Sequence, residues 1–406
     1  PPPPPPPPLF FFKQKTAYEI GVRLVVSEMC LRDRIGTMKI LFLTSLVIIS
    51  PIFLMAEIID VFFGTRGNES KGIYYSTFET ELGKLSSAKV VAEISSPGWI
   101  TMDPDNKYLY AAGTLDEPCV AAYKIGEKGK LTFLNSANTG DGSSAHVAVH
   151  PSKKFLITAQ YGGGSVNVYP IKPDGLVGKR SQHIEHKGGS GVVASRQDAP
   201  HPHWTGFSPD GRFAFIPDLG LDQIVIYKVD EAKGTLSEHG FAQSVPGGGP
   251  RHMRFSVDGK YIFLLNELTL SVTTFAYNAG TGTTARKTTT SALTDDQKAM
   301  QNFNSSSEIL VHVNGKFVYS ANRGDDTVTL YWANPISGHL TVKAVENVRG
   351  AFPRNINLDP SGNWFLAGGQ HSNTVNVFSV DQKSGKLNHQ IGNVINVPQP
   401  ICILFK

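Results

Sequence analysis

The sequence has little cysteine, and its polar and apolar residues show no long helical period. Of its three cysteines, only Cys119 and Cys402 lie beyond the first 37 residues. Two distant thiols provide neither a disulfide framework nor the spacing of a metal site, so we expect no metal and no other cofactor. The 406 residues include 40 glycines and 26 prolines, which indicates frequent turns in place of long helices.

A strong excess of charge is also absent. The formal net charge is +4 at pH 7, and the first 37 residues contribute five basic and three acidic side chains to it. The remainder therefore carries a net charge of about +2, which is too small to predict binding to nucleic acid or to an acidic membrane surface.

The first 37 residues do not have the pattern of a folded domain. The run "PPPPPPPP" followed by "LFFFKQKTAYEIGVRLVVSEMCLRDR" resembles the translation of a homopolymer and a sequencing-library adapter. The alternative is a genuine polyproline arm ahead of a helix. Either way, residues 1–37 are set apart from the domain that follows.

Residues 38–56 have the pattern of a secretory signal. Met38 and Lys39 precede the uncharged run "ILFLTSLVIISPIFLMA", which ends at Ala56. Leu54 is a poor residue for a cleavage site, so an uncleaved anchor is the alternative, although a run broken by proline is short for a membrane span. We expect export to the periplasm or the medium, no stable membrane insertion after cleavage, and a mature domain over residues 57–406.

A repeated unit dominates the rest of the chain. A strand, a tight turn such as Pro-Asp-Gly and a second strand recur six times, for example as "TGFSPDGRFAFIPD" and "INLDPSGNWFLAGG". The turns are 47, 58, 48, 56 and 47 residues apart. A third strand and a weaker fourth follow each pair, which is typical of a propeller blade. Because one blade cannot bury both faces alone, we expect a closed ring.

The two ends of the chain predict a seventh blade. "PQPICILFK" at the C-terminus has the pattern of a first strand, whereas "IDVFFGT", "GIYYSTFE" and "AKVVAEI" have the pattern of the other three. The fold class is therefore all-β, a seven-bladed β-propeller closed by pairing of its N- and C-terminal strands. A parallel β-helix or two stacked sandwiches would not predict complementary half-units.

The first strand of each blade would line the central channel. The seven equivalent residues on these strands are Trp99, His146, His203, His252, Glu308, Asn355 and Cys402. This set predicts a polar ring at one channel mouth, joined by Arg251 and Arg354, which directly precede two ring residues. The alternative is that the ring is polar only because water fills the channel.

The two longest intervals contain insertions, residues 179–200 and 286–304, that we expect to wall this mouth. The first brings Arg196 and His201 close to His203. Two further histidines of this insertion, at positions 183 and 186, are expected to be exposed to solvent.

The ends of the second strands contribute Asp218, Glu267 and Arg323. We expect Asp218 to cap backbone amides between blades. Glu267 and Arg323 are candidate site residues, with a simple ion pair as the alternative for the arginine.

Several motifs, in order and in register, resemble one protein family. "RQDAPHPHWTGFSPDGRFAFIPDLG", "GGGPRHMRFSVDGKYIFLLNE", "SSSEILVHVNGKFVYSANRGDD" and "FPRNINLDPSGNWFLAGGQHS" resemble the seven-bladed lactonase propellers, which include bacterial 6-phosphogluconolactonases and fungal carboxymuconate cyclases. The resemblance covers Ile58 to Lys406. It implies hydrolysis or formation of a small-molecule lactone at the channel mouth without a metal, by a protein expected to be a monomer.

The resemblance also implies roles for single residues. His146, Arg196 and Arg251 match the histidine and two arginines proposed to act in the cyclase branch, whereas the associated glutamate has no clear counterpart. His203 and Glu308 fall within the lactonase-type motifs "PHPH" and "SSSEI". The missing glutamate favours hydrolysis over the cyclase reaction.

Lactone opening needs a base to activate water and a cation to hold the developing oxyanion. We therefore expect His203 or His146 to act as the base, Arg251 to stabilise the oxyanion, and Arg196 to belong to the catalytic group. The residues predicted to bind the substrate are His201, His252, Glu267, Glu308, Arg323 and Arg354. Export argues against a cytosolic phosphate ester, so a non-catalytic periplasmic binding propeller is the alternative.

Overall fold

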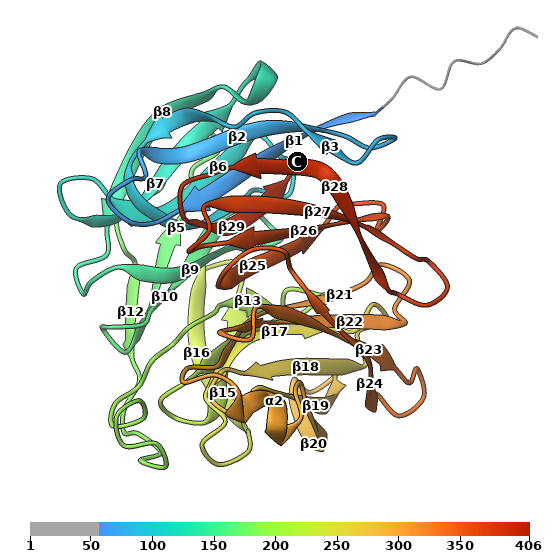
Figure 1. Cartoon of the computed structure of the whole chain (residues 1–406). Helices are drawn as coiled ribbons and strands as arrows, with labels where there is room; N and C mark the ends of the chain where they lie inside the picture. The colour runs from blue at the N-terminus through green and yellow to red at the C-terminus, as the bar shows by residue number, and fades with distance from the viewer. Residues whose placement is uncertain (1–56) are drawn as a thin grey trace, which may run out of the picture. The chain divides into compact units, whose positions relative to one another are not determined.

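The computed structural model describes residues 57–406, which fold into seven antiparallel sheets (Figure 1). The predictions made for residues 1–37 and 38–56 lie outside the described residues. The first three sheets contain β29 (Pro400–Phe405), β1 (Ile58–Thr65), β2 (Gly72–Glu79), β3 (Lys84–Leu85) and β4 (Lys89–Glu93); β5 (Ser95–Met102), β6 (Tyr108–Thr114), β7 (Pro118–Ile125) and β8 (Leu131–Asn138); and β9 (Ser144–Val149), β10 (Phe155–Gln160), β11 (Ser165–Pro170) and β12 (Gln182–Glu185).

The remaining four sheets each contain four strands. They are β13 (Gly206–Phe207), β14 (Phe213–Asp218), β15 (Gln223–Asp230) and β16 (Thr235–Gln243); β17 (Pro250–Phe255), β18 (Tyr261–Asn266), β19 (Ser271–Asn278) and β20 (Thr283–Ser291); β21 (Ser305–Val311), β22 (Phe317–Arg323), β23 (Thr327–Ala333) and β24 (Leu340–Asn347); and β25 (Pro353–Leu358), β26 (Trp364–Gly369), β27 (Thr374–Val380) and β28 (Leu387–Asn396). The helical elements in the described part are the short η1 (Glu127–Gly129) and α2 (Asp295–Ala299).

The two chain ends build one blade together. β29 pairs with β1 in antiparallel register, with Phe62 opposite Leu404 and Phe63 opposite Ile403. Figure 1 shows the blue first strands beside the red last strand. This pairing covers the edge that β1 would otherwise expose, which confirms the predicted seven-bladed ring and its closure.

The core lies between neighbouring sheets. Phe62 of the first blade packs in one cluster with Ile100 and Leu109 of the next, and both faces of each sheet are apolar. Hydrogen bonds cross the same interfaces, since the hydroxyl of Tyr110 donates to Gly175 O at 3.1 Å and that of Tyr319 donates to Gly385 O at 2.7 Å. A single blade would expose these faces, so the ring is the stable unit.

The tight turns after several inner strands are held by a buried polar residue. Asp103 accepts hydrogen bonds from the amides of Lys107 and Tyr108 at 2.7 Å. At the equivalent places, the imidazole of His150 contacts Gly211 O and that of His312 contacts Gly362 O in the following blades. The turn residues therefore also fix the spacing of neighbouring blades.

The first insertion is anchored more firmly than predicted. Its first residues form the outer strand β12, so the added loop begins at His186. His186 was expected to be exposed, which is wrong: its Nδ1 lies 2.6 Å from Asp218 Oδ2 and its Nε2 lies 2.9 Å from the hydroxyl of Tyr227. Asp218 also accepts from the amides of His201 and Gly220, which agrees with its predicted capping role.

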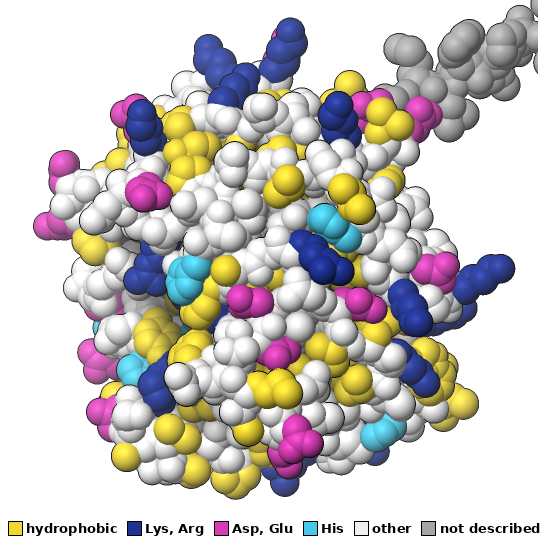
Figure 2. All heavy atoms as spheres, viewed as in Figure 1, with side chains coloured by type: hydrophobic (Ala, Val, Ile, Leu, Met, Phe, Trp, Pro, Cys, Tyr) yellow, Lys and Arg dark blue, Asp and Glu magenta, His cyan; other side chains and the backbone are white. Residues whose placement is uncertain are grey.

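The surface of the propeller has mixed charge. On the face shown in Figure 2, lysine and arginine side chains are interspersed with acidic ones, with no field of a single sign. Within residues 57–406, no helix is long and apolar enough to cross a bilayer.

Candidate active site

β-bulges in two inner strands change the direction of single side chains. The register between β17 and β18 shifts between Pro250 and His252, and that between β25 and β26 shifts between Pro353 and Asn355. A β-bulge places two residues opposite one and turns a side chain toward a new direction. Here the bulges sit at Arg251 and Arg354, and both side chains line the same cavity.

This cavity, named the arginine cavity, has a volume of about 690 Å³. Its charged lining consists of five arginines and one glutamate, so its potential is strongly positive and suits an anionic ligand. The charged and aromatic side chains of the lining are Arg66, Arg196, Arg251, Arg323, Arg354, Glu267, His203, His252, Trp99, Tyr161 and Phe303.

Glu267 organises three of the arginines. Its Oε1 accepts a hydrogen bond from Arg196 Nη2 at 2.9 Å, and its Oε2 lies 2.9 Å from Arg251 Nε and 3.2 Å from Arg323 Nη2. Burial alone would raise the pKa of this carboxyl, but Arg323 and Arg251 lower the pKa well below its usual range. Glu267 is therefore an ionised anchor that holds the guanidinium groups in place.

Arg251 is the most constrained of these arginines. Besides Glu267, it donates to the backbone carbonyl of Ser307 and to Nε2 of His252, and its side chain is buried. Its Nη2 makes no hydrogen bond within the described residues, so these N–H groups are free for a ligand. Burial and Arg323 lower the pKa of Arg251 to about 10, so it is cationic at neutral pH.

His203 is the imidazole that faces the arginine cavity with both nitrogens free. Its Nδ1 is buried without a hydrogen-bond partner, and Nε2 has none within the described residues. Burial, with Arg251 and His252 nearby, lowers the pKa of His203 well below its ordinary 6.5. The ring is therefore neutral at pH 7 and can accept a proton. An unpaired buried polar atom costs stability and often marks a functional site.

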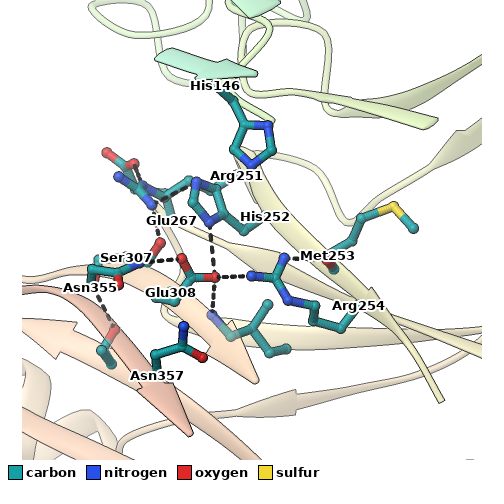
Figure 3. A network of polar contacts seen from close by, with 12 residues as sticks. His146, Arg251, His252, Met253, Arg254, Glu267, Ser307, Glu308, Asn355 and Asn357 are labelled. Carbon is teal, nitrogen blue, oxygen red and sulfur yellow. Dashed lines mark hydrogen bonds and ion pairs between the residues drawn. The ribbon is translucent and has the colours of Figure 1, made fainter. Parts of the chain in front are cut away.

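His252 has no free nitrogen. Its Nε2 accepts from Arg251 at 3.1 Å, so Nδ1 carries the proton and donates to Glu308 Oε1 at 3.0 Å (Figure 3). Burial and Arg251 also lower the pKa of His252 well below 6.5. It therefore cannot serve as a base, and its role is to connect Arg251 to Glu308.

Glu308 does not reach a ligand, in contrast to its predicted role in substrate binding. Its side chain is fully buried, and it accepts hydrogen bonds from Arg254, Asn355 and the amide of Ile309, as well as from His252. Every oxygen is occupied by protein donors, because a carboxylate at the centre of the ring must be satisfied from within. Burial raises the pKa of Glu308, and the positive charge of Arg254 partly opposes this rise.

The seven ring residues do not all face one mouth. His146, Asn355 and Cys402 line a second cavity on the other side of the ring, whereas His203 and His252 line the arginine cavity and Trp99 lines both. The ring side chains pack against one another, since the centroids of the Trp99 and His146 rings lie 4.2 Å apart and those of His203 and His252 lie 5.2 Å apart. The predicted catalytic group is therefore divided, because Arg196 and Arg251 line the arginine cavity whereas His146 lines the second cavity.

Arg196 reaches the site because its loop is pinned at both ends. The neighbouring Gln197 is buried and donates to Leu219 O and to Asp222 Oδ1. Arg196 Nη2 also donates to the hydroxyl of Tyr161 at 3.1 Å. His201 lies outside the cavity lining and stacks on Tyr161 with ring centroids 4.6 Å apart, so it supports this tyrosine and does not contact the cavity itself.

Two arginines keep their charge available for a ligand. Within residues 57–406, the guanidinium groups of Arg354 and Arg66 form no ion pair or hydrogen bond, and both line the arginine cavity. Burial, Arg251 and Arg323 lower the pKa of Arg354. An incoming anion would relieve this repulsion between like charges.

Two lining residues, Arg66 and Tyr161, were not singled out from the sequence. Each directly follows the end of a second strand, as Glu267 does, and Arg323 is the last residue of its own second strand. Counting one residue past this strand in every blade would have found them. The sequence also offered no clear glutamate partner for Arg196 and Arg251, whereas the structure places Glu267 against both.

The fold is a seven-bladed β-propeller, and the site is a cavity whose charged lining consists of five arginines and one glutamate. The sequence matches the family model "Lactonase, 7-bladed beta-propeller" over residues 60–405. The chain therefore belongs to the seven-bladed β-propeller lactonase family.

Individual relatives cover nearly the whole propeller. The 6-phosphogluconolactonase of Bacillus subtilis strain 168 is 33% identical over 343 residues, covering 84% of this chain and 96% of the relative. A solved structure from Lactobacillus plantarum matches with a TM-score of 0.81 and 28% identity, covering 86% of this chain and 100% of that one. The periplasmic gluconolactonase of Pseudomonas aeruginosa matches with a TM-score of 0.79 and 27% identity, covering 86% and 99%.

The buried histidines predict that acid destabilises the fold. The folded state keeps His146, His203 and His252 neutral, because burial lowers each pKa well below 6.5. The unfolded chain takes up protons below pH 6.5, so the free energy of unfolding falls as the pH falls. Between about pH 7.5 and about pH 5.5 the three histidines together contribute a loss of up to roughly 4 kcal/mol, about 1.4 for each histidine.

Chemical unfolding at the two pH values measures this change. Glu308 works in the opposite direction because burial raises its pKa, and it offsets part of the loss. The variant His203→Asn removes one of the three histidines, so its stability should depend less on pH by about 1.4 kcal/mol. Equal pH dependence in the variant and the parent protein would contradict a neutral buried His203.

Proposed function

We propose that this protein hydrolyses the lactone of a sugar acid in the arginine cavity. The observation that carries the proposal is the pairing of a neutral, unpartnered His203 with Arg251, whose Nη2 is free, in one lining. Membership of the lactonase family and the names of the relatives support the same reaction.

The reaction follows from the chemistry of these two side chains. A neutral His203 accepts a proton from water as the oxygen attacks the lactone carbonyl. Arg251 donates hydrogen bonds to the carbonyl oxygen as it becomes anionic, while Glu267 and Ser307 hold the guanidinium in place. The imidazolium then returns its proton to the ring oxygen as the carbon–oxygen bond breaks, which yields the free acid.

The remaining arginines would bind the anionic part of the substrate. Arg354 and Arg66 carry no internal counter-charge, and guanidinium groups match the oxygens of phosphate or carboxylate. A phosphorylated sugar lactone fits this arrangement, whereas a neutral lactone would leave both cations unpaired. We therefore propose a phosphorylated or otherwise anionic sugar lactone as the substrate.

Acid release from purified protein tests the proposal directly. Hydrolysis of 6-phosphogluconolactone and of gluconolactone is followed by pH-stat, with correction for spontaneous opening. We expect catalysed release from the phosphorylated lactone with the greater kcat/KM. No acceleration of either lactone or of a wider lactone panel, combined with tight binding of a glycan, would favour a non-catalytic binding propeller.

The substitution Arg354→Gln should separate binding from chemistry. A charge-assisted hydrogen bond contributes on the order of 2 kcal/mol, so we expect KM for the phosphorylated lactone to rise about 10-fold or more, with kcat little changed. KM for the neutral lactone should change less. Arg349→Gln, at an exposed arginine outside the cavity, is the matched control. An equal effect on both lactones would refute the assignment.

Lactone formation of the cyclase type has one observation in its favour, because a glutamate does lie against Arg196 and Arg251. However, Arg323 and Arg251 hold the pKa of Glu267 low, so this carboxylate has no proton to donate. The structure therefore favours hydrolysis as the direction. Export of the protein stays a prediction from residues 38–56.

A further inference from the structure

A second ring of channel-facing residues lies one pleat beyond the first. Side chains two residues apart on a strand point to the same face, about 7 Å apart along the chain. Applied to the seven inner strands, this spacing gives Thr101, Ala148, Thr205, Arg254, Leu310, Asn357 and Leu404, and all seven line the second cavity. This far cavity has a volume of about 540 Å³ and lies across the packed ring from the arginine cavity.

The chemistry of the far cavity differs sharply from that of the arginine cavity. Its lining is mostly apolar and aromatic, and Arg254 is its single charged side chain, with no carboxylate among the lining residues. Trp99, Trp204, Phe207 and Phe255 supply flat apolar surface. A ligand for this cavity therefore needs an apolar body and a single acceptor group.

Part of the Arg254 guanidinium is available to a ligand in the far cavity. It donates to Glu308 Oε1 at 3.0 Å and to Met253 O at 2.9 Å, its guanidinium carbon lies 5.7 Å from the centre of the Trp204 ring, and 27% of its side chain is exposed. Its Nε makes no hydrogen bond within the described residues. The guanidinium is thus fixed in direction by protein contacts while part of it faces the cavity.

His146 provides a second donor in the same cavity. The backbone amide of Thr205 donates to His146 Nδ1 at 3.3 Å, so the proton of the neutral ring resides on Nε2. No residue in the described part of the chain accepts a hydrogen bond from this Nε2. Two donors, one charged and one neutral, therefore belong to a lining without a carboxylate of its own, while Glu308, outside the lining, pairs with one nitrogen of Arg254.

We propose that the far cavity is a second binding site, specific for a small carboxylate with a flat apolar body. Arg254 and His146 bind the carboxylate, and the aromatic body packs among Trp204, Phe207 and Phe255. The site is distinct from the arginine cavity, because the two cavities have only Trp99 in common among their lining residues. Its ligand is also distinct, because a sugar phosphate would find neither enough cations nor enough polar partners there.

Calorimetric titration of the full chain with benzoate tests this site, with benzamide as the neutral analogue. We expect benzoate to bind at least 10-fold more tightly than benzamide, because an acceptor of the same shape without charge loses the ion pair. Two substitutions locate the binding. Thr101→Trp should fill the far cavity and weaken benzoate at least 10-fold, while Thr101→Val, of nearly the same volume, should leave it unchanged.

The arginine cavity could also attract a carboxylate, so Arg354→Gln is measured in parallel. Benzoate binding that survives Arg354→Gln and is lost in Thr101→Trp and Arg254→Gln supports the proposal. Benzoate binding that is lost in Arg354→Gln but kept in Thr101→Trp, or equal binding of benzoate and benzamide, overturns it. Melting temperatures show whether each variant is folded, and Thr101→Trp keeps the test valid if Arg254→Gln unfolds.

Discussion

Replacing His203 with asparagine is expected to reduce kcat for lactone hydrolysis about 100-fold or more, because the general base is lost. Asparagine keeps a polar side chain of similar reach but accepts no proton at neutral pH. KM should change little, since the arginines that bind the anionic part of the substrate remain in place. Initial rates on 6-phosphogluconolactone at neutral pH measure the effect.

The matched control for this variant is His201→Asn. His201 stacks on Tyr161 and does not line the arginine cavity, so the same substitution two residues away should leave most of kcat intact. The fold of both variants is checked by thermal unfolding. Activity of His203→Asn within a few-fold of the parent would remove His203 from the reaction and direct attention to another base.

The substitution Glu267→Gln is expected to lower the free energy of unfolding by about 3–5 kcal/mol, the usual cost of removing one partner from a buried ion pair. Among residues 57–406, Glu267 is the single carboxylate that contacts Arg196, Arg251 and Arg323. Glutamine would leave these cations without a counter-charge and turn a donor toward other donors. We also expect kcat/KM to fall, because Arg251 would lose its orientation.

An exposed ion pair gives the comparison for Glu267. Asp105 lies 2.8 Å from Lys153 in a pair that is about 40% exposed on each side, and such exposed pairs contribute little to stability. Chemical denaturation should therefore find Asp105→Asn close to the parent protein. If Glu267→Gln were equally harmless, the arginines would not depend on this carboxylate.

The fold could be predicted almost completely because its information is local. Each blade repeats its own alternation of apolar residues and its own turn, and the incomplete units at Ile58 and Cys402 can be recognised without coordinates. The structure confirms the seven sheets over residues 57–406 and the pairing of β1 with β29. The exposure predicted for His186 was wrong, since a distant contact with Asp218 overrides the polar character of its loop.

The site could be predicted only in part, because it depends on geometry that repeats do not encode. The alignment of inner strands identified the seven equivalent residues, but a β-bulge next to His252 is what brings Arg251 into the same cavity lining. The division of the ring between two cavities likewise depends on how Trp99 and His146 stack. Protein groups occupy every side-chain hydrogen-bonding position of Glu308 and His252. This removes Glu308 from direct contact with a substrate and His252 from base catalysis, and it has no signature in the sequence.

The pairing of β29 with β1 has a consequence for how the protein is made. Ribosomes synthesise β1 before β29, so the blade that contains both strands stays incomplete until every other blade has been translated. Until β29 has been made, the nascent chain carries an uncovered strand edge that a second chain could occupy. A chain truncated before Pro400 would therefore have six finished blades and an open ring.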